Sequence, residues 1–176
     1  YGSCPEGIDR FWTEMLQSSY NECTNNARYR WQTRPYAHRM PTMGINEHYY
    51  AAIESFLACA GKLGGSELYR TDAIALAAFY LAAKADDLLD KINWAYVAGN
   101  TSEVPAFERQ FLNLLAEADC LLESHPVFRL QRWVDLAGRA GQSPEERDRF
   151  TGELRRLVTV WGGPPRSPDG PGCRGC

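Results

Sequence analysis

The chain has 176 residues, a formal net charge of −3, 44% hydrophobic residues and five tryptophans. This length suits one domain with a sizeable core, and the composition excludes a predominantly disordered chain. The weak negative charge and scattered arginines argue against nucleic acid or an anionic membrane surface as partner. No apolar run approaches the ~20 residues that a membrane span needs.

Apolar residues recur at steps of three and four through most of the sequence, which predicts helices and no strands. Residues 21–45 lose this period and carry Pro35, Pro41 and Gly44, so they are expected to be irregular. The remaining pattern predicts six helices, over about 8–20, 46–64, 67–98, 101–122, 126–137 and 143–161. The expected fold is therefore all-α, a bundle-like domain of about six helices joined by short connections.

Several helix boundaries carry recognisable local signals. Asn46 is expected to cap the second helix, and Ser66 to open the third. Ser143 is followed by proline and two glutamates, a combination that favours a helix start. Gly99 with Asn100 is expected to end the long third helix.

The last two helices each carry an apolar stripe that is expected to be buried. In the fifth helix the stripe contains Leu130, Trp133, Val134 and Ala137, and in the sixth it contains Phe150, Leu154, Leu157, Val158 and Trp161. At about 100° per residue, Arg155 falls at the margin of the sixth helix's stripe and Arg156 opposite to it. Trp133 and Trp161 are therefore expected to anchor helix packing.

Asp86, Asp87 and Asp90 form an aspartate-rich pattern typical of metal–diphosphate sites, but a second acidic cluster on a facing helix is missing. A solvated helix face is the expected role. Cys173 and Cys176 form a C-x-x-C pair without a second ligand pair, and the three histidines show no ligand spacing. The sequence therefore predicts no metal site, no cofactor and no catalytic residue.

The remaining cysteines and one asparagine bear on the compartment. Cys59 and Cys120 fall on apolar helix faces and are expected to be core thiols. Cys4 and Cys23 flank the first helix and could pair in an oxidising compartment, although spacing alone leaves the connectivity open. Asn100, in the triplet Asn-Thr-Ser, is a candidate glycosylation site, which gives modest support to a secretory route.

Four segments appear in a distinctive order: "LYRTD" at 68–72, "SHPVFRLQRW" at 124–133, "SPEERDRF" at 143–150 and "RRLVTVWGG" at 155–163. With "FWTEMLQSSYN" at 11–21, they resemble the C-terminal helical domain of the alpha-N-acetylglucosaminidase family over about residues 1–163.

That resemblance implies a glycoside hydrolase that removes terminal alpha-linked N-acetylglucosamine from heparan sulfate, in the lysosome or secreted. It implies a retaining mechanism with two glutamates on a barrel domain of the same polypeptide, which this chain lacks. The barrel and the glycan would be the partners, and no catalytic or substrate-binding residue is assigned here. Positions with an expected structural role are Arg70, Asp72, Trp133, Arg155 and Trp161.

Three departures from the family pattern stand out. A polar run after "LYRTD" is replaced by Ala75 to Phe79, and a Trp-Tyr pair near the cleft is replaced by Met43-Gly44. Residues 164–176 fit none of the family's later helices and are expected to be a disordered tail. The chain is therefore expected to be a truncated fragment, with a non-catalytic helical interaction module as the alternative.

Overall fold

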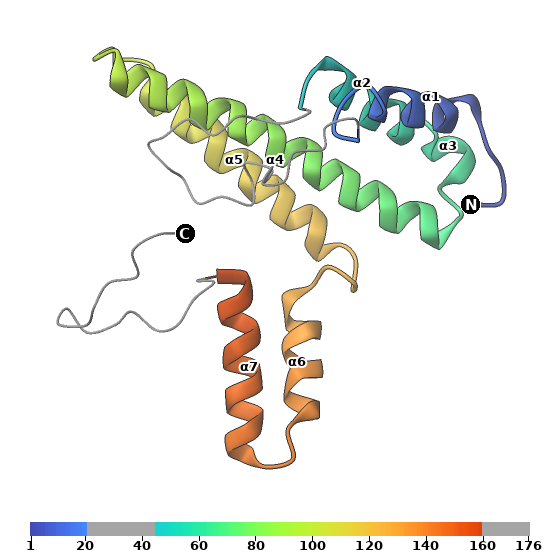
Figure 1. Cartoon of the computed structure of the whole chain (residues 1–176), viewed down its shortest axis with the longest axis vertical. Coiled ribbons are helices and arrows are strands. Elements are labelled where there is room, and N and C mark those ends of the chain that lie inside the picture. The colour runs from blue at the N-terminus through green and yellow to red at the C-terminus, as the bar shows by residue number, and fades with distance from the viewer. Residues whose placement is uncertain (21–44, 160–176) are drawn as a thin grey trace. The chain divides into compact units, whose positions relative to one another are not determined.

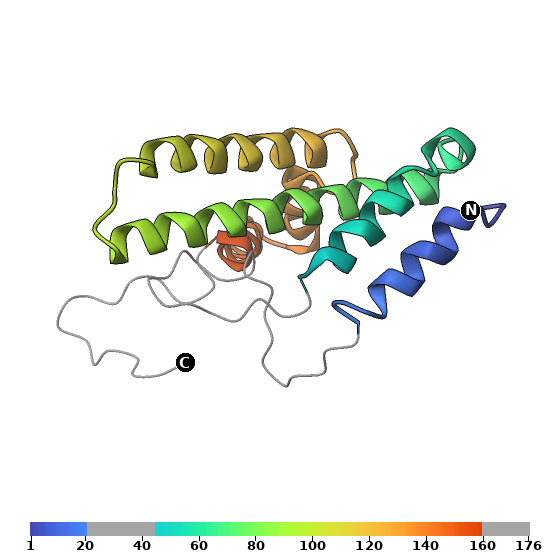
Figure 2. The same cartoon turned by 90° about the horizontal axis from the view of Figure 1, so that it is seen from above.

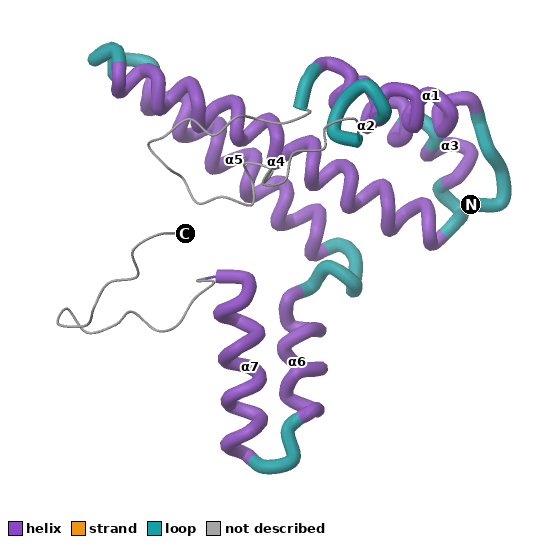
Figure 3. Tube along the Cα trace, in the orientation of Figure 1, coloured by secondary structure: helices purple, strands orange, loops and turns teal. Residues whose placement is uncertain are grey.

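The computed structural model describes residues 1–20 and 45–159. Within these residues every regular element is a helix and the connections are loops, so the expected all-α class is confirmed (Figure 3). Six longer helices and one four-residue helix follow in the order α1 (Glu6–Met15), α2 (Glu47–Leu57), α3 (Ala60–Leu63), α4 (Glu67–Val97), α5 (Val104–Glu123), α6 (Leu130–Ala140) and α7 (Pro144–Thr159). The expected second helix is thus divided into α2 and α3.

The chain forms two compact units, residues 1–125 and a second that begins at Pro126. The irregular segment expected at 21–45 lies outside the described residues except for Ile45, as do Met43-Gly44, Trp161 and the tail. Figure 1 shows the first unit with α1 against α2, and α2 beside the N-terminal half of α4.

The core of the first unit lies where α1, α2 and α4 meet. Ile53 of α2 is fully buried and Phe56 almost so, and Phe11 of α1 packs edge-on against Phe56 at 5.1 Å between ring centroids. Tyr69 of α4 is 2% exposed and stacks on Phe56 at 4.9 Å. Burial of these large apolar side chains stabilises the packing of α1 and α2, helices too short to be stable alone, against α4.

Three predicted helix starts are confirmed by their capping hydrogen bonds, whereas the helix expected from Pro126 begins only at Leu130, as α6. Asn46 Oδ1 accepts from the Tyr49 amide at 3.2 Å, and Ser66 Oγ accepts from the Tyr69 amide at 3.4 Å. Ser143 Oγ accepts from the Glu146 amide at 3.2 Å. Each bond satisfies an amide that the first helical turn leaves without a backbone acceptor.

The long helix α4 continues past α2 and pairs with α5. The two helices run side by side in both views of the ribbon (Figure 2). Gly99 adopts φ 70°, the left-handed conformation that glycine takes without steric cost, and so ends α4 where the sequence predicts. Within α5 only Val104 is buried, and Leu112 is 62% exposed.

In the second unit, α6 and α7 form a helical hairpin around Val134, which is 5% exposed. The expected stripes are partly wrong. Leu130 and Trp133 are 43% and 46% exposed, and Leu157 is 59% exposed. Two helices can cover only one side of each stripe, so the apolar residues on the other side face solvent.

Two single-residue expectations, at Cys120 and Asp86, are also wrong. Cys59 is buried as expected, but Cys120 is exposed on α5, because α4 covers a different face of that helix. Asp86 is buried, 6% exposed, so the expectation of a wholly solvated aspartate face is wrong there. Cys4 is exposed and free, and its candidate partner Cys23 lies outside the described residues.

A glycine pair tests the contact between α1 and α2. A Cβ at Gly7 would lie 2.6 Å from Cys59 Sγ and 2.7 Å from the Ser55 carbonyl oxygen, whereas a Cβ at Gly61 would meet nothing within 4 Å. We expect Gly7→Ala to lower the free energy of unfolding by about 1–3 kcal/mol, because α1 must move away from α2. Gly61→Ala, the matched control, should raise it by about 0.4–1 kcal/mol.

Urea unfolding of both variants beside the parent measures this difference. Equal midpoints for the two variants would show that α1 does not approach α2 this closely.

Candidate functional site

A group of interacting polar and aromatic side chains joins α2 to α4 and consists of Tyr50, Glu54, Tyr80, Lys84 and Asp87, here called the tyrosine–carboxylate cluster. The Tyr50 hydroxyl donates to Asp87 Oδ2 at 2.9 Å, and the Tyr80 hydroxyl donates to Glu54 Oε1 at 2.8 Å. The two rings meet edge to face at 5.2 Å, and Lys84 Nζ lies 3.8 Å from the centroid of the Tyr50 ring. Each helix therefore sends one tyrosine to a carboxylate of the other.

The electrostatics of the cluster keep both phenols protonated. Burial, followed by the hydrogen bond to Asp87, raises the pKa of Tyr50 well above its usual range. The hydrogen bond to Glu54, followed by burial, raises the pKa of Tyr80. Phenols held in this state donate hydrogen bonds and cannot act as general bases near neutral pH. The cluster therefore braces α2 against α4.

Sequence reasoning missed this cluster, although a signal was present. Tyr80, Lys84 and Asp87 stand at positions i, i+4 and i+7 of α4, which places them on one helix face. A search for amphipathic helices looks for apolar residues at that spacing, and it therefore does not detect a face made of polar and aromatic residues.

The aspartate-rich pattern does not assemble a metal site. Asp87 is engaged by Tyr50, and Asp86 is turned into the protein. Among the described residues, no three His, Cys, Asp or Glu side chains come together as metal ligands.

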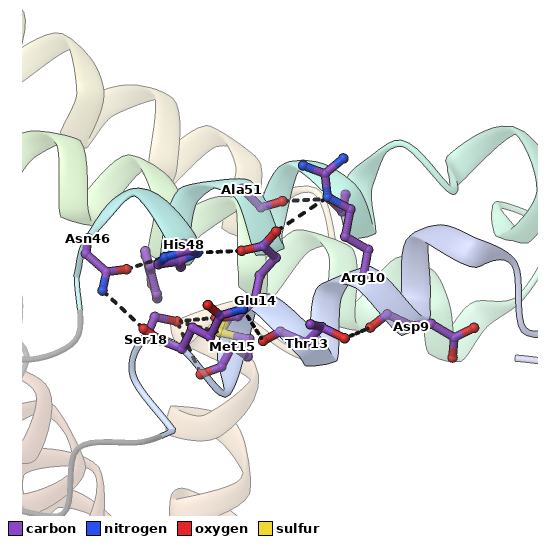
Figure 4. A network of polar contacts seen from close by, with 12 residues as sticks. Asp9, Arg10, Thr13, Glu14, Met15, Ser18, Asn46, His48 and Ala51 are labelled. Carbon is purple, nitrogen blue, oxygen red and sulfur yellow. Dashed lines mark hydrogen bonds and ion pairs between the residues drawn. The ribbon is translucent and has the colours of Figure 1, made fainter.

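A second polar network joins α1 to the start of α2 (Figure 4). His48 Nδ1 lies 2.7 Å from Glu14 Oε2, and Arg10 Nε lies 3.6 Å from Glu14 Oε1. Asn46 Nδ2 donates to the Gln17 carbonyl at 3.2 Å, while its Oδ1 caps α2. The hydrogen bond to His48 is the main cause of the lowered pKa of Glu14.

Arg70 occupies the first turns of α4, as the sequence predicts. Its Nη1 donates to the Gly64 carbonyl at 2.7 Å, and its Nε donates to Glu67 Oε2 at 3.1 Å. His125 Nε2 lies 2.8 Å from Glu67 Oε1, so the end of the α5 region is tied to the start of α4. The hydrogen bonds from His125 and then Arg70 lower the pKa of Glu67.

Asp72 fixes the start of the chain against α4. The Tyr1 hydroxyl donates to Asp72 Oδ2 at 2.5 Å, and the Tyr1 ring packs edge-on against Phe56 and Tyr69. Burial and the bond to Asp72 raise the pKa of Tyr1 to about 12.

The other predicted positions lie apart from these networks. The Trp133 indole donates to the Val127 carbonyl at 2.9 Å. Arg155 is exposed on α7, and the neighbouring Arg156 pairs with Glu153 at 2.6 Å. Asn100 is exposed in the loop after α4, where its Oδ1 accepts from Ser102 Oγ at 3.0 Å. Its glycosylation stays a prediction.

Comparison with known protein families shows which family this chain belongs to. The family model described as "Alpha-N-acetylglucosaminidase (NAGLU) C-terminal domain" matches residues 1–169, past position 163 where the resemblance was expected to stop. The chain belongs to this family. The resemblance inferred from the order of sequence segments between residues 11 and 163 is thereby confirmed.

A solved structure supports the fold assignment of this alpha-N-acetylglucosaminidase-type domain. The chain is similar to a family 89 glycoside hydrolase from Clostridium perfringens, in complex with 2-acetamido-1,2-dideoxynojirmycin, with a TM-score of 0.78 at 21% identity. The match covers 93% of this chain and 20% of that one, so the chain spans about a fifth of the length of that glycosidase. None of the curated proteins compared matches the sequence. Of the helices described, none is both long and apolar enough to cross a membrane.

The two histidine–glutamate pairs predict how stability depends on pH. Because the folded-state pKa values of Glu14 and Glu67 are lowered, their contribution to stability is present above the unfolded glutamate pKa of about 4.3 and is lost as the pH falls through the folded values. We expect the urea midpoint to decrease as the pH falls below about 5. The double variant Glu14→Gln/Glu67→Gln should flatten that decrease.

The control is Glu6→Gln together with Glu47→Gln, two exposed glutamates on α1 and α2. If the control double variant flattens the acid decrease as much as the Glu14/Glu67 variant does, the histidine pairs are not its source.

Proposed function

We propose that this chain is the helical domain of an alpha-N-acetylglucosaminidase-type glycoside hydrolase and acts beside a catalytic barrel in the same polypeptide. The observation that carries the proposal is the family match across residues 1–169. The substrate class is terminal alpha-linked N-acetylglucosamine on heparan-sulfate-type glycans, and the location is the lysosome or the cell exterior. The substrate class and the location are both taken from the family resemblance.

The exposed apolar residues of the first unit support the proposal that this chain packs against a neighbouring domain. Leu112 and Leu115 of α5 are 62% and 44% exposed, and Trp94 near the end of α4 is 54% exposed. Exposed large apolar side chains on both helices of the α4–α5 pair support an interface on this part of the chain. The similar glycosidase has about four-fifths of its length outside the matched part. A neighbouring domain of the same polypeptide is therefore the occupant that we propose.

The proposed role for the helical domain is to support the barrel and complete its cleft. Retaining glycosidases need two carboxyl groups about 5 Å apart, one as nucleophile and one as acid–base catalyst. Glu54 and Asp87 of the tyrosine–carboxylate cluster each accept a hydrogen bond from a tyrosine, and Glu14 and Glu67 each pair with a histidine. We therefore place both catalytic glutamates on the barrel.

The alternative is a helical interaction module without catalysis. The run from Ala75 to Phe79 favours it, because this apolar sequence stands where the family carries polar residues. Phe79 is 39% exposed on α4, a position from which it could contact a protein partner. The region encoded before Tyr1 distinguishes the two: a barrel with paired glutamates supports the hydrolase, and its absence supports the module.

We expect the purified 176-residue chain not to hydrolyse an aryl alpha-N-acetylglucosaminide, since neither catalytic glutamate lies on it. The measurement is release of the aryl alcohol at pH 4–8, compared with the longer polypeptide that includes the upstream region. Turnover by the chain alone, abolished by substituting one of its own Asp or Glu residues, would overturn the assignment of catalysis to the barrel.

The proposed contact between this chain and the barrel is tested with one apolar and one polar substitution on α5. Leu112→Ser should weaken association of this chain with the separately produced upstream region about tenfold, by removing an apolar contact worth about 1–2 kcal/mol. Gln110→Ser, also exposed on α5, should leave the affinity within about twofold. Isothermal titration calorimetry measures both. Equal affinities would show that the face containing Leu112 does not meet the barrel.

A further inference from the structure

A groove runs between the two helices of the second unit. Its open volume is about 560 Å³, and its lining consists of Val134, Asp135, Gly138, Arg139, Arg147 and Thr151. The first four come from α6 and the last two from α7. Steps of four along each helix place the lining residues one turn apart on a single face. The groove therefore has one arginine from each helix in its lining.

Two glycines shape the groove by allowing close approach of the chain. A Cβ at Gly138 would lie 3.3 Å from the Thr151 methyl, so the bare backbone of α6 leaves space at the floor. A Cβ at Gly141 would lie 2.6 Å from the Arg147 amide nitrogen and 2.8 Å from its Cγ. Arg147 therefore packs directly on the backbone of the turn that joins α6 to α7.

The two arginines differ in how they are held. Arg147 Nε donates to the Gly141 carbonyl at 3.2 Å, which fixes the stem and orients the guanidinium. Its two terminal nitrogens contact no acceptor in residues 1–20 or 45–159, and Arg139 makes no hydrogen bond or ion pair to any of these residues. Two arginines with unused donors thus line one groove, and planar guanidinium groups are well suited to pair with the oxygens of sulfate or carboxylate.

Charge in this part of the chain favours the same ligand. Residues 126–159 contain seven arginines against five Asp and Glu residues, although the whole chain has a net charge of −3. One carboxylate, Asp135, lines the groove and accepts from Gln131 Nε2 at 2.7 Å. The negative charge of Asp135 repels an anion, so neutralising this side chain is expected to strengthen anion binding, whereas removing an arginine weakens it.

We propose that the α6–α7 groove binds an oxyanionic group of the size of sulfate or carboxylate, held by Arg139 and Arg147. The site does not depend on the glycosidase activity proposed above, and either can fail without the other. Because the groove is open to water, the affinity for a single small anion is expected to be on the order of millimolar.

The test is an NMR titration of the 176-residue chain with sodium sulfate, with sodium chloride holding the ionic strength constant. Saturable shifts are expected at the Nε–H groups of Arg139 and Arg147 and at the Thr151 methyl. Arg139→Gln should weaken sulfate binding about tenfold, as loss of a charged hydrogen-bond donor does. Asp135→Asn should strengthen it several-fold.

Arg132→Gln is the matched control, since Arg132 is exposed on the same helix but does not line the groove. It should leave the sulfate affinity within about twofold. Shifts that rise linearly with sulfate, or an equal loss in Arg132→Gln and Arg139→Gln, would overturn the proposal. Circular dichroism establishes that each variant retains its helices.

Glucose 6-sulfate and glucose identify the source of the anion. Tighter binding of glucose 6-sulfate than of inorganic sulfate would assign the group to a saccharide, and equal binding would assign it to a free anion. Both results support an oxyanion site. Binding of uncharged glucose with the same shifts at Arg139 and Arg147 would contradict it.

Discussion

The hydroxyl group of Tyr69 holds the first unit together. It donates to the carbonyl oxygen of Phe56 at 2.8 Å and to that of Leu57 at 3.3 Å, at the end of α2 where carbonyl groups run out of helical partners. The same side chain stacks its ring on Phe56, and burial raises its pKa. One residue thus ends α2, anchors the start of α4 and fills the core between them. The Glu67–His125 pair, two residues earlier on α4, extends this anchoring to the end of the α5 region.

The other described helices, α5 to α7, lack a comparable centre. The packing of α5 buries only Val104, and that of α6 buries only Val134. Helices of this length are marginal without burial of an apolar face. In the first unit, Leu112 and Leu115 leave such a face open, and in the second Trp133, Leu136 and Leu157 do. A domain that completes its core against a neighbour would show this distribution, with one self-sufficient region and others that depend on contact.

The features that the sequence predicts well are those set by neighbouring residues. Asn46, Ser66 and Ser143 cap helices because a side-chain oxygen can reach an amide three residues ahead, whatever the tertiary structure. The errors at Trp133 and Leu157 have a different origin. An apolar stripe shows which residues of a helix can be buried. Which of them are buried depends on the element that packs against the helix. The tyrosine–carboxylate cluster escaped prediction because it depends on the register between α2 and α4, which no local pattern contains.

The charge distribution differs between the two units. Residues 1–125 hold sixteen Asp and Glu residues against ten Lys and Arg, whereas residues 126–159 hold an excess of arginine. In the first unit three of the acidic side chains are used internally, since Glu14, Glu67 and Asp87 each pair with a side chain of another segment. At physiological salt, screening confines such fields to about 8 Å. An anionic ligand is therefore governed by the groups nearest to it, and the α6–α7 groove combines two available guanidinium groups with a single opposing carboxylate.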